Sequence, residues 1–243
     1  MTNEILKIND LNKSFAKRKV INKLDLTVSR GDIYGFIGAN SQGKTTTIRM
    51  ITGLVFPDSG EILINGKSVF NEKKTSLKNL GAMVEAPRFY ENLSGYENLK
   101  LMANLIDNVG EKEIQEVLEL VHLSDRQKDK FSNYSMGMKQ RLGIANTLLG
   151  NPDLIILDEP TNGLDPNGME EINELIIYLA KTFQKTFFIS SHLLHEMEGI
   201  CNRIGILHQG KLCVEGELKE LLFQSNVANL KELYFQKVGY HHA

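Results

Sequence analysis

One loop pattern constrains this chain more than any other feature. Residues 38–45 read GANSQGKT, which fits the phosphate-binding pattern G-x-x-x-x-G-K-[ST] at every fixed position. An apolar run over 32–37 precedes the loop, and a helix-like pattern over 46–52 follows it. This is the strand–loop–helix context that the pattern requires. The sequence therefore predicts that the chain binds a nucleotide.

Charge explains what this loop is expected to do. A triphosphate is strongly anionic, and the loop offers backbone N–H groups, the positive end of a helix dipole and one ammonium. Gly38 and Gly43 are expected to adopt positive φ, which lets the backbone approach the phosphates closely. Lys44 is expected to reach the β- and γ-phosphates, and the Thr45 hydroxyl is expected to hold Mg²⁺.

Two adjacent acids follow a second apolar strand. Residues 154–157 lead directly into Asp158 and Glu159. Unpaired charge is costly at a buried strand end, so two adjacent carboxylates there indicate a binding partner or a functional role. Beside a phosphate loop we expect Asp158 to hold Mg²⁺ and Glu159 to activate water as the general base. The alternative is an ordinary acidic pair that caps a helix.

Two further signals are weaker when taken alone. His192 closes a strand pattern over 186–190, so it is expected at the same sheet edge as the acids, where a ring nitrogen could hydrogen-bond the γ-phosphate. A lone histidine is more often structural. Ser135 is expected to cap the N-terminus of a helix, and Gly137 leaves backbone room there.

The order of these patterns predicts an α/β fold with a mainly parallel sheet. Short strand patterns fill residues 4–36, and Asn65-Gly66 predicts a hairpin turn. Apolar residues recur at spacings of three and four over 88–149, which indicates an inserted α-helical lobe. From 154 strands alternate with helices, and the tail from about 217 is typical of a surface helix.

Composition limits the class of protein. A chain of 243 residues with a net charge of −2 can form one sizeable core, and the absence of a basic block argues against a nucleic-acid partner. No window of about 18 consecutive apolar residues is present, so we expect a soluble cytosolic protein. Cys201 and Cys213 lack metal-site spacing and are expected to be buried. His241 and His242 are expected to be a frayed end rather than a metal site.

Taken in order, these motifs resemble those of the ATP-binding-cassette (ABC) ATPases over roughly residues 3–222. The resemblance implies a RecA-like P-loop fold with an N-terminal antiparallel β-subdomain, a helical subdomain at about 88–149 and a helical tail over 223–243. It implies ATP and Mg²⁺ as cofactors, and it assigns catalysis to Lys44, Glu159 and His192. The residues that it assigns to the nucleotide are Phe15, Gly38, Asn40, Ser41, Gly43, Lys44, Thr45, Thr46, Ser135, Gly137 and Asp165.

The resemblance also implies partners. In that family two cassettes pair head to tail, so Ser135 and Gly137 would serve the nucleotide held by the other copy. Asp165 falls in the D-loop, and Phe15 falls where an aromatic ring stacks on adenine. The implied assembly is an ATP-bound homodimer docked to polytopic membrane permease subunits at the cytoplasmic face of the membrane.

Several positions depart from the usual pattern of the family. Met136 and Met138 replace a Gly and a Gln of the signature motif, and Ser41 replaces a Gly of the phosphate loop. Glu85 stands where most cassettes carry Gln. This Glu and its flanking residues resemble the bacitracin- and lantibiotic-resistance exporters of Gram-positive bacteria, so we expect export of a peptide antibiotic.

Glu85 admits more than one role. Its carboxylate can reach Mg²⁺ directly or through water, but it adds charge near an anionic γ-phosphate. Our hypothesis is that Glu85 couples the cassette to the membrane subunits rather than serving the chemistry. The alternative is a solvated loop acid with no role.

Two other classes of function compete with this one. One is a soluble ABC ATPase that acts on ribosomes or DNA, but the chain has a single uninterrupted cassette, nearly neutral charge and no heptad run. The other is a nucleotide-gated binding module without turnover. The presence of Lys44, Asp158, Glu159 and His192 argues against that module.

Overall fold

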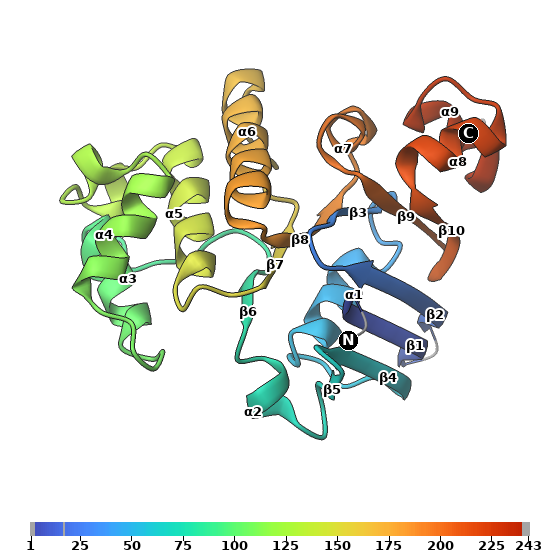
Figure 1. Cartoon of the computed structure of the whole chain (residues 1–243), viewed down its shortest axis with the longest axis horizontal. Coiled ribbons are helices and arrows are strands. Elements are labelled where there is room, and N and C mark those ends of the chain that lie inside the picture. The colour runs from blue at the N-terminus through green and yellow to red at the C-terminus, as the bar shows by residue number, and fades with distance from the viewer. Residues whose placement is uncertain (1–2, 17, 240–243) are drawn as a thin grey trace.

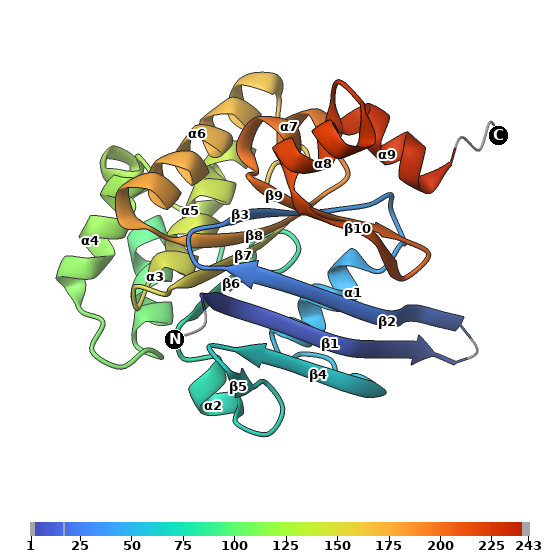
Figure 2. The same cartoon turned by 45° about the vertical axis from the view of Figure 1, so that its right-hand side comes forward.

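Two β-sheets lie one above the other in this chain, with the helix α1 (Lys44–Ile51) between them (Figures 1 and 2). The structure is a computed structural model and describes residues 3–16 and 18–239. Within these residues, no helix combines the length and the apolar character that crossing a membrane requires.

The smaller sheet is antiparallel and has the strand order β2-β1-β4-β5. Asn65 and Gly66 connect its last two strands with φ values of 52° and 74°, so the predicted hairpin is confirmed. Its strands are β1 (Glu4–Phe15), β2 (Arg18–Ser29), β4 (Ser59–Ile64) and β5 (Lys67–Ser68).

The larger sheet has the order β10-β9-β3-β8-β7-β6 and is parallel except for the β9–β10 hairpin, which confirms the predicted mainly parallel sheet. Its strands are β3 (Ile33–Ile37), β6 (Leu80–Met83), β7 (Leu154–Asp158), β8 (Thr186–Ser191), β9 (Arg203–His208) and β10 (Lys211–Glu217).

The central strands are buried on both faces, which is why they read as continuous apolar runs. Successive side chains of a strand point to opposite faces. Tyr34 and Phe36 of β3 therefore pack with α1 and the smaller sheet, whereas Ile33 and Ile37 pack with the helices on the other side. The sheet separates two apolar cores.

Three helices, α3 to α5, gather at one end of the molecule, and α6 and α7 cover the larger sheet (Figures 1 and 2). The position of this helical group agrees with the lobe expected at about 88–149, whose limits stay a prediction. The helices after α1 are α2 (Lys73–Ser76), α3 (Gly95–Ala103), α4 (Glu111–Leu120), α5 (Met136–Leu148), α6 (Pro166–Phe183), α7 (Leu194–Ile200), α8 (Leu218–Ser225) and α9 (Leu230–Val238). Short 3₁₀ turns occupy Ser124–Arg126 and Phe131–Asn133.

The tail differs from the single helix that was expected. Asn226 takes a left-handed φ of 52° and ends α8, and the Asn229 side chain then caps α9 by accepting a hydrogen bond from Glu232 N at 2.9 Å. Residue 222, the expected limit of the cassette, lies inside α8. The tail packs on the core through Leu230 and Leu233, which are buried.

One cysteine prediction is wrong. Cys201 is buried, but Cys213 is exposed because β10 is an edge strand of the larger sheet. His241 and His242 lie outside the described residues.

Candidate active site

The phosphate loop connects the end of β3 to the start of α1, as its pattern predicts. Gly43 has a φ of 110°, and a Cβ there would lie 2.6 Å from Ile21 Cδ1, so only glycine fits. The prediction of positive φ at Gly38 is wrong. Glycine is needed at position 38 for close approach, because a Cβ would lie 2.6 Å from the Leu207 carbonyl oxygen.

Neighbouring elements brace this loop from outside. The Arg18 guanidinium donates to the Ser41 carbonyl oxygen at 3.4 Å, and the Gln209 N–H donates to Gln42 Oε1 at 2.5 Å. Ser41 takes a φ of 63° where the usual glycine would carry no steric penalty. The loop therefore holds its curled form without that glycine.

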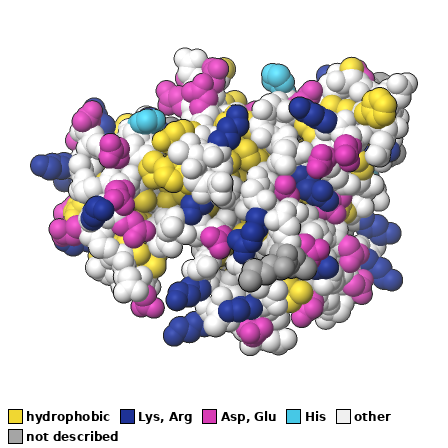
Figure 3. Space-filling view, in the orientation of Figure 1, with side chains coloured by type: hydrophobic (Ala, Val, Ile, Leu, Met, Phe, Trp, Pro, Cys, Tyr) yellow, Lys and Arg dark blue, Asp and Glu magenta, His cyan; other side chains and the backbone are white. Residues whose placement is uncertain are grey.

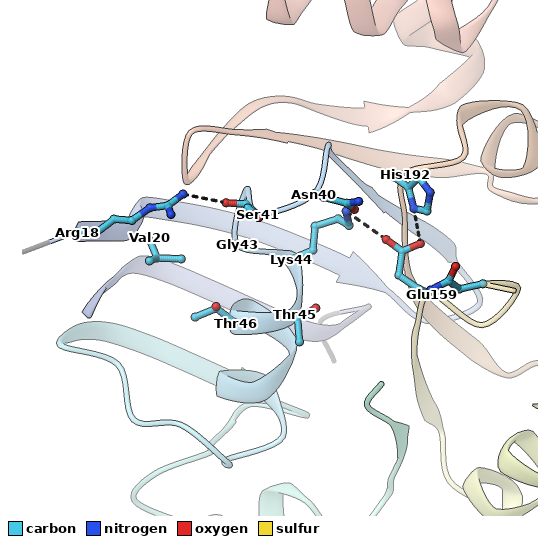
Figure 4. A pocket seen from close by; sticks show the side chains of 11 residues that line it. Arg18, Val20, Asn40, Ser41, Gly43, Lys44, Thr45, Thr46, Glu159 and His192 are labelled. Atoms are coloured by element: carbon cyan, nitrogen blue, oxygen red, sulfur yellow. Dashed lines mark hydrogen bonds and ion pairs between the residues drawn. The ribbon is translucent and has the colours of Figure 1, made fainter. Parts of the chain in front are cut away.

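Lys44 points back across the loop that carries it. Its side chain is only 6% exposed, and Nζ donates to the Gly38 carbonyl oxygen at 2.6 Å. The same ammonium lies 3.2 Å from Glu159 Oε1 (Figure 4). The cation is thus fixed at the mouth of the loop.

The two acids take different positions although they are adjacent. Asp158 ends β7, is 4% exposed and accepts a hydrogen bond from Ser190 Oγ at 2.5 Å. Glu159 takes a φ of 49°, and its N–H donates to the Ser190 carbonyl oxygen at 3.1 Å. This turn at the end of the strand sends the Glu159 carboxylate toward Lys44.

His192 completes the cluster from the next strand. It follows directly after β8, and its Nδ1 lies 2.8 Å from Glu159 Oε2 (Figure 4). One carboxylate is therefore held between the Lys44 ammonium and an imidazole. Parallel strands bring this about, because the carboxyl ends of β3, β7 and β8 meet at one sheet edge.

These groups surround a cavity of about 450 Å³, within the usual range for small-molecule sites. Eight of the predicted site residues line it. Three lining residues were missed by the sequence analysis: Arg18 and Val20 of β2, and Asn162. The full lining is Arg18, Val20, Asn40, Ser41, Gly43, Lys44, Thr45, Thr46, Glu159, Asn162 and His192.

Other predicted residues lie away from this cavity. Phe15 ends β1, is 49% exposed and has the Lys13 ammonium 5.3 Å from its ring centre. Ser135 is exposed and caps α5, accepting from Met138 N at 3.3 Å, and open space surrounds Gly137. Asp165 caps α6 by accepting from Gly168 N at 3.0 Å.

Glu85 also lies outside the lining. It takes a φ of 63° and forms an ion pair with Arg49 in the last turn of α1. It contributes instead to a separate cavity of about 260 Å³ beside α5. The role of Glu85 as a metal ligand stays a prediction.

The fold and the site together define an ABC-type ATPase. The sequence model of the ABC transporter family matches residues 21–162 of this chain, so the chain belongs to that family. It is an ATP-binding, ATP-hydrolysing subunit of the kind that serves ABC transporters.

Two relatives and one solved structure show which kinds of ABC transporter subunit this chain is similar to. The chain is 48% identical to the bacitracin transport ATP-binding protein BcrA of Bacillus licheniformis, over 96% of this chain and 74% of the relative. It is 39% identical to the lantibiotic transport ATP-binding protein SrtF of Streptococcus pyogenes, over 96% and 97% of the two chains. A solved ATP-binding subunit of an ABC transporter superposes with a TM-score of 0.84 at 31% identity, covering 96% and 98%.

Proposed function

We propose that this chain hydrolyses ATP to drive export of a peptide antibiotic of the bacitracin or lantibiotic type. The observation that carries the proposal is the Glu159 carboxylate, held between Lys44 and His192 at the mouth of the phosphate-loop cavity. The names of the relatives that share most of the chain support the choice of cargo.

In this proposal each residue of the site has its own role. Lys44 and the free N–H groups at the start of α1 bind the phosphates. Glu159 takes a proton from the attacking water, and His192 orients the carboxylate through the 2.8 Å contact. Asn40, Ser41, Gly43 and Thr46 shape the wall around the phosphates.

A magnesium ion fits the groups that are present. The Thr45 hydroxyl lines the cavity, and Ser190 occupies only one of the two carboxylate oxygens of the nearly buried Asp158. Hydroxyl and carboxylate oxygens are the ligands that Mg²⁺ prefers. When bound by Thr45 and Asp158, the ion would neutralise charge on the β- and γ-phosphates.

We further propose that two copies pair head to tail. Ser135, Gly137 and Asp165 lie outside the cavity of their own chain, so they are available to a nucleotide held by the partner. The pair would dock at the cytoplasmic face of the membrane on polytopic permease subunits. A role on ribosomes or DNA is not favoured, because acidic and basic side chains are interspersed over the face in Figure 3.

A cell-based experiment tests the cargo. Expression of the chain with its membrane subunits should raise resistance to bacitracin or to a lantibiotic, and the Glu159→Gln variant should not. The tagged chain should also co-purify with a polytopic membrane protein. Unchanged resistance to both antibiotic classes, together with active phosphate release in vitro, would reject the cargo while leaving the ATPase in place.

A further inference from the structure

A second contact joins the two segments that carry Glu159 and His192. Thr161 lies two residues after Glu159, and its hydroxyl donates to Glu196 Oε2 at 2.9 Å. Glu196 lies four residues after His192, on α7. Two neighbouring contacts, Glu159 to His192 and Thr161 to Glu196, therefore link the same pair of segments.

The Glu196 carboxyl is held at an energetic cost. Its Oε1 atom is buried and makes no hydrogen bond within the described part of the chain. Burial raises the pKa of Glu196, the bond from Thr161 opposes that rise, and the charge of Glu159 adds to it. His192 and His195 act in the lowering direction. A partly buried carboxyl with one unpaired oxygen is less favourable than a packed apolar side chain, so stability alone does not explain Glu196.

The loop fixed by this contact serves the site directly. Asn162 N donates to the Glu159 carbonyl oxygen, and Leu164 N donates to the Thr161 carbonyl oxygen, both at 3.1 Å. Thr161 thus sits in the middle of two consecutive turns and is only 2% exposed. On either side of it, Glu159 and Asn162 face the cavity.

We infer that Glu196 is a positioning residue, which acts through the Thr161 hydroxyl to hold the turn that aims Glu159 and Asn162 at the nucleotide. The inference rests on the proposed role of Glu159 as the base. Glu196 lines no part of the cavity, and its hydrogen bond from Thr161 is the direct contact that connects it to the turn. A shift of the turn would misplace the base while leaving the phosphate loop intact.

Steady-state kinetics of purified Thr161 variants test this inference. Thr161→Val keeps the side-chain shape and removes the hydroxyl, so kcat should fall about tenfold while KM for ATP changes by less than about twofold. Thr161→Ser restores the donor and should return kcat to within about twofold of the parent. A purely packing role predicts the reverse order, because Val fills the space better than Ser.

Variants of Glu196 test the positioning role independently of the Thr161 variants. Glu196→Gln retains an acceptor oxygen and should keep nearly full kcat, whereas Glu196→Leu should lose as much as Thr161→Val. The double variant Thr161→Val with Glu196→Leu should be no slower than either single one. Equal kcat for the Gln and Leu variants, or additive losses in the double variant, would overturn the inference.

The Glu159→Gln variant separates this inference from the function on which it rests. If Glu159→Gln abolishes phosphate release while every Thr161 and Glu196 variant retains the parent rate, only the positioning role fails. If Glu159→Gln itself retains the parent rate, the base is misassigned and the inference falls with it. Thermal unfolding of each variant identifies any that does not fold. If a variant of one residue fails to fold, the variants of the other residue test the inference.

Discussion

The ammonium of Lys44 lies 3.2 Å from Oε1 of Glu159, so the proposed phosphate-binding cation and the proposed base form an ion pair. A γ-phosphate and this carboxylate compete for the same ammonium. We expect Lys44 to turn toward the phosphate when a nucleotide binds, while the 2.8 Å contact with His192 keeps Glu159 oriented. In the proposed mechanism the ion pair holds Glu159 in place until the phosphate replaces this carboxylate as the partner of Lys44.

Lys44→Ala should lose most of the affinity for nucleotide. Among the residues that the structure describes, Lys44 supplies the one ammonium that lines the cavity, and hydrogen bonds to charged groups contribute about 1.5–3 kcal/mol each. ATP should raise the melting temperature of the parent and leave that of the variant unchanged. An ATP-dependent shift equal to the parent's would show that the phosphates bind elsewhere.

Glu85→Gln should separate hydrolysis from transport. Because Glu85 pairs with Arg49 and lies outside the lining of the nucleotide cavity, phosphate release by the isolated chain should stay near the parent rate. Antibiotic resistance in cells should change, and Arg49→Gln should change it in the same direction. A loss of hydrolysis as large as that of Glu159→Gln would contradict this division.

Gly38→Ala should destabilise the fold by about 1–3 kcal/mol, because the new methyl group meets the Leu207 carbonyl oxygen at 2.6 Å. Gly199→Ala is the matched control. It adds the same methyl group to α7, where nothing lies within 4 Å, and should stabilise by up to about 1 kcal/mol. Urea unfolding of the three proteins measures both differences, and equal stability of Gly38→Ala and the parent would contradict the close approach.

Glu215 should make stability depend on pH. Burial raises its pKa above the ordinary 4.5, although hydrogen bonds from Thr27 N and the Tyr34 hydroxyl oppose the rise. The folded state then binds the proton more tightly than the unfolded state. The resulting stability is fully present below the unfolded pKa and is lost as pH rises through the folded pKa.

Glu215→Gln should remove that slope, so the variant gains stability relative to the parent as pH rises from 4.5. Glu97 supplies a control of opposite sign. Hydrogen bonds from the Ser94 N–H and hydroxyl lower the pKa of Glu97, so its stabilisation is lost as pH falls. Denaturant unfolding of the parent, Glu215→Gln and Glu97→Gln on both sides of pH 4.5 measures both effects. Parallel curves for Glu215→Gln and the parent above pH 4.5 would refute the effect of Glu215.

Much of the site could be predicted because it is built from strand ends. Lys44, Glu159 and His192 follow three strands that are neighbours in a parallel sheet, and such ends meet at one edge. The contact of His192 Nδ1 with Glu159 was not predicted from the sequence, and the expected contact of His192 with the γ-phosphate stays a prediction. Periodicity places a residue at an edge but does not choose among its partners there.

The remaining features depend on contacts between distant segments. Arg18 and Val20 reach the cavity from the antiparallel sheet, and no local motif marks them. The reason for glycine at position 38 is a carbonyl of Leu207 on another strand. Asn162 could have been found, since it lies within the turn that follows Glu159.

The most direct test of the account follows the Glu159→Gln variant in the presence of Mg-ATP. Sedimentation of the purified protein should show a dimer with ATP and a monomer without it, and phosphate release should fall by at least about a hundredfold. The parent should hydrolyse ATP and return to the monomer. A variant that stays monomeric at saturating ATP, or that releases phosphate near the parent rate, would contradict the assignment of Glu159 as the base of an ATP-clamping pair.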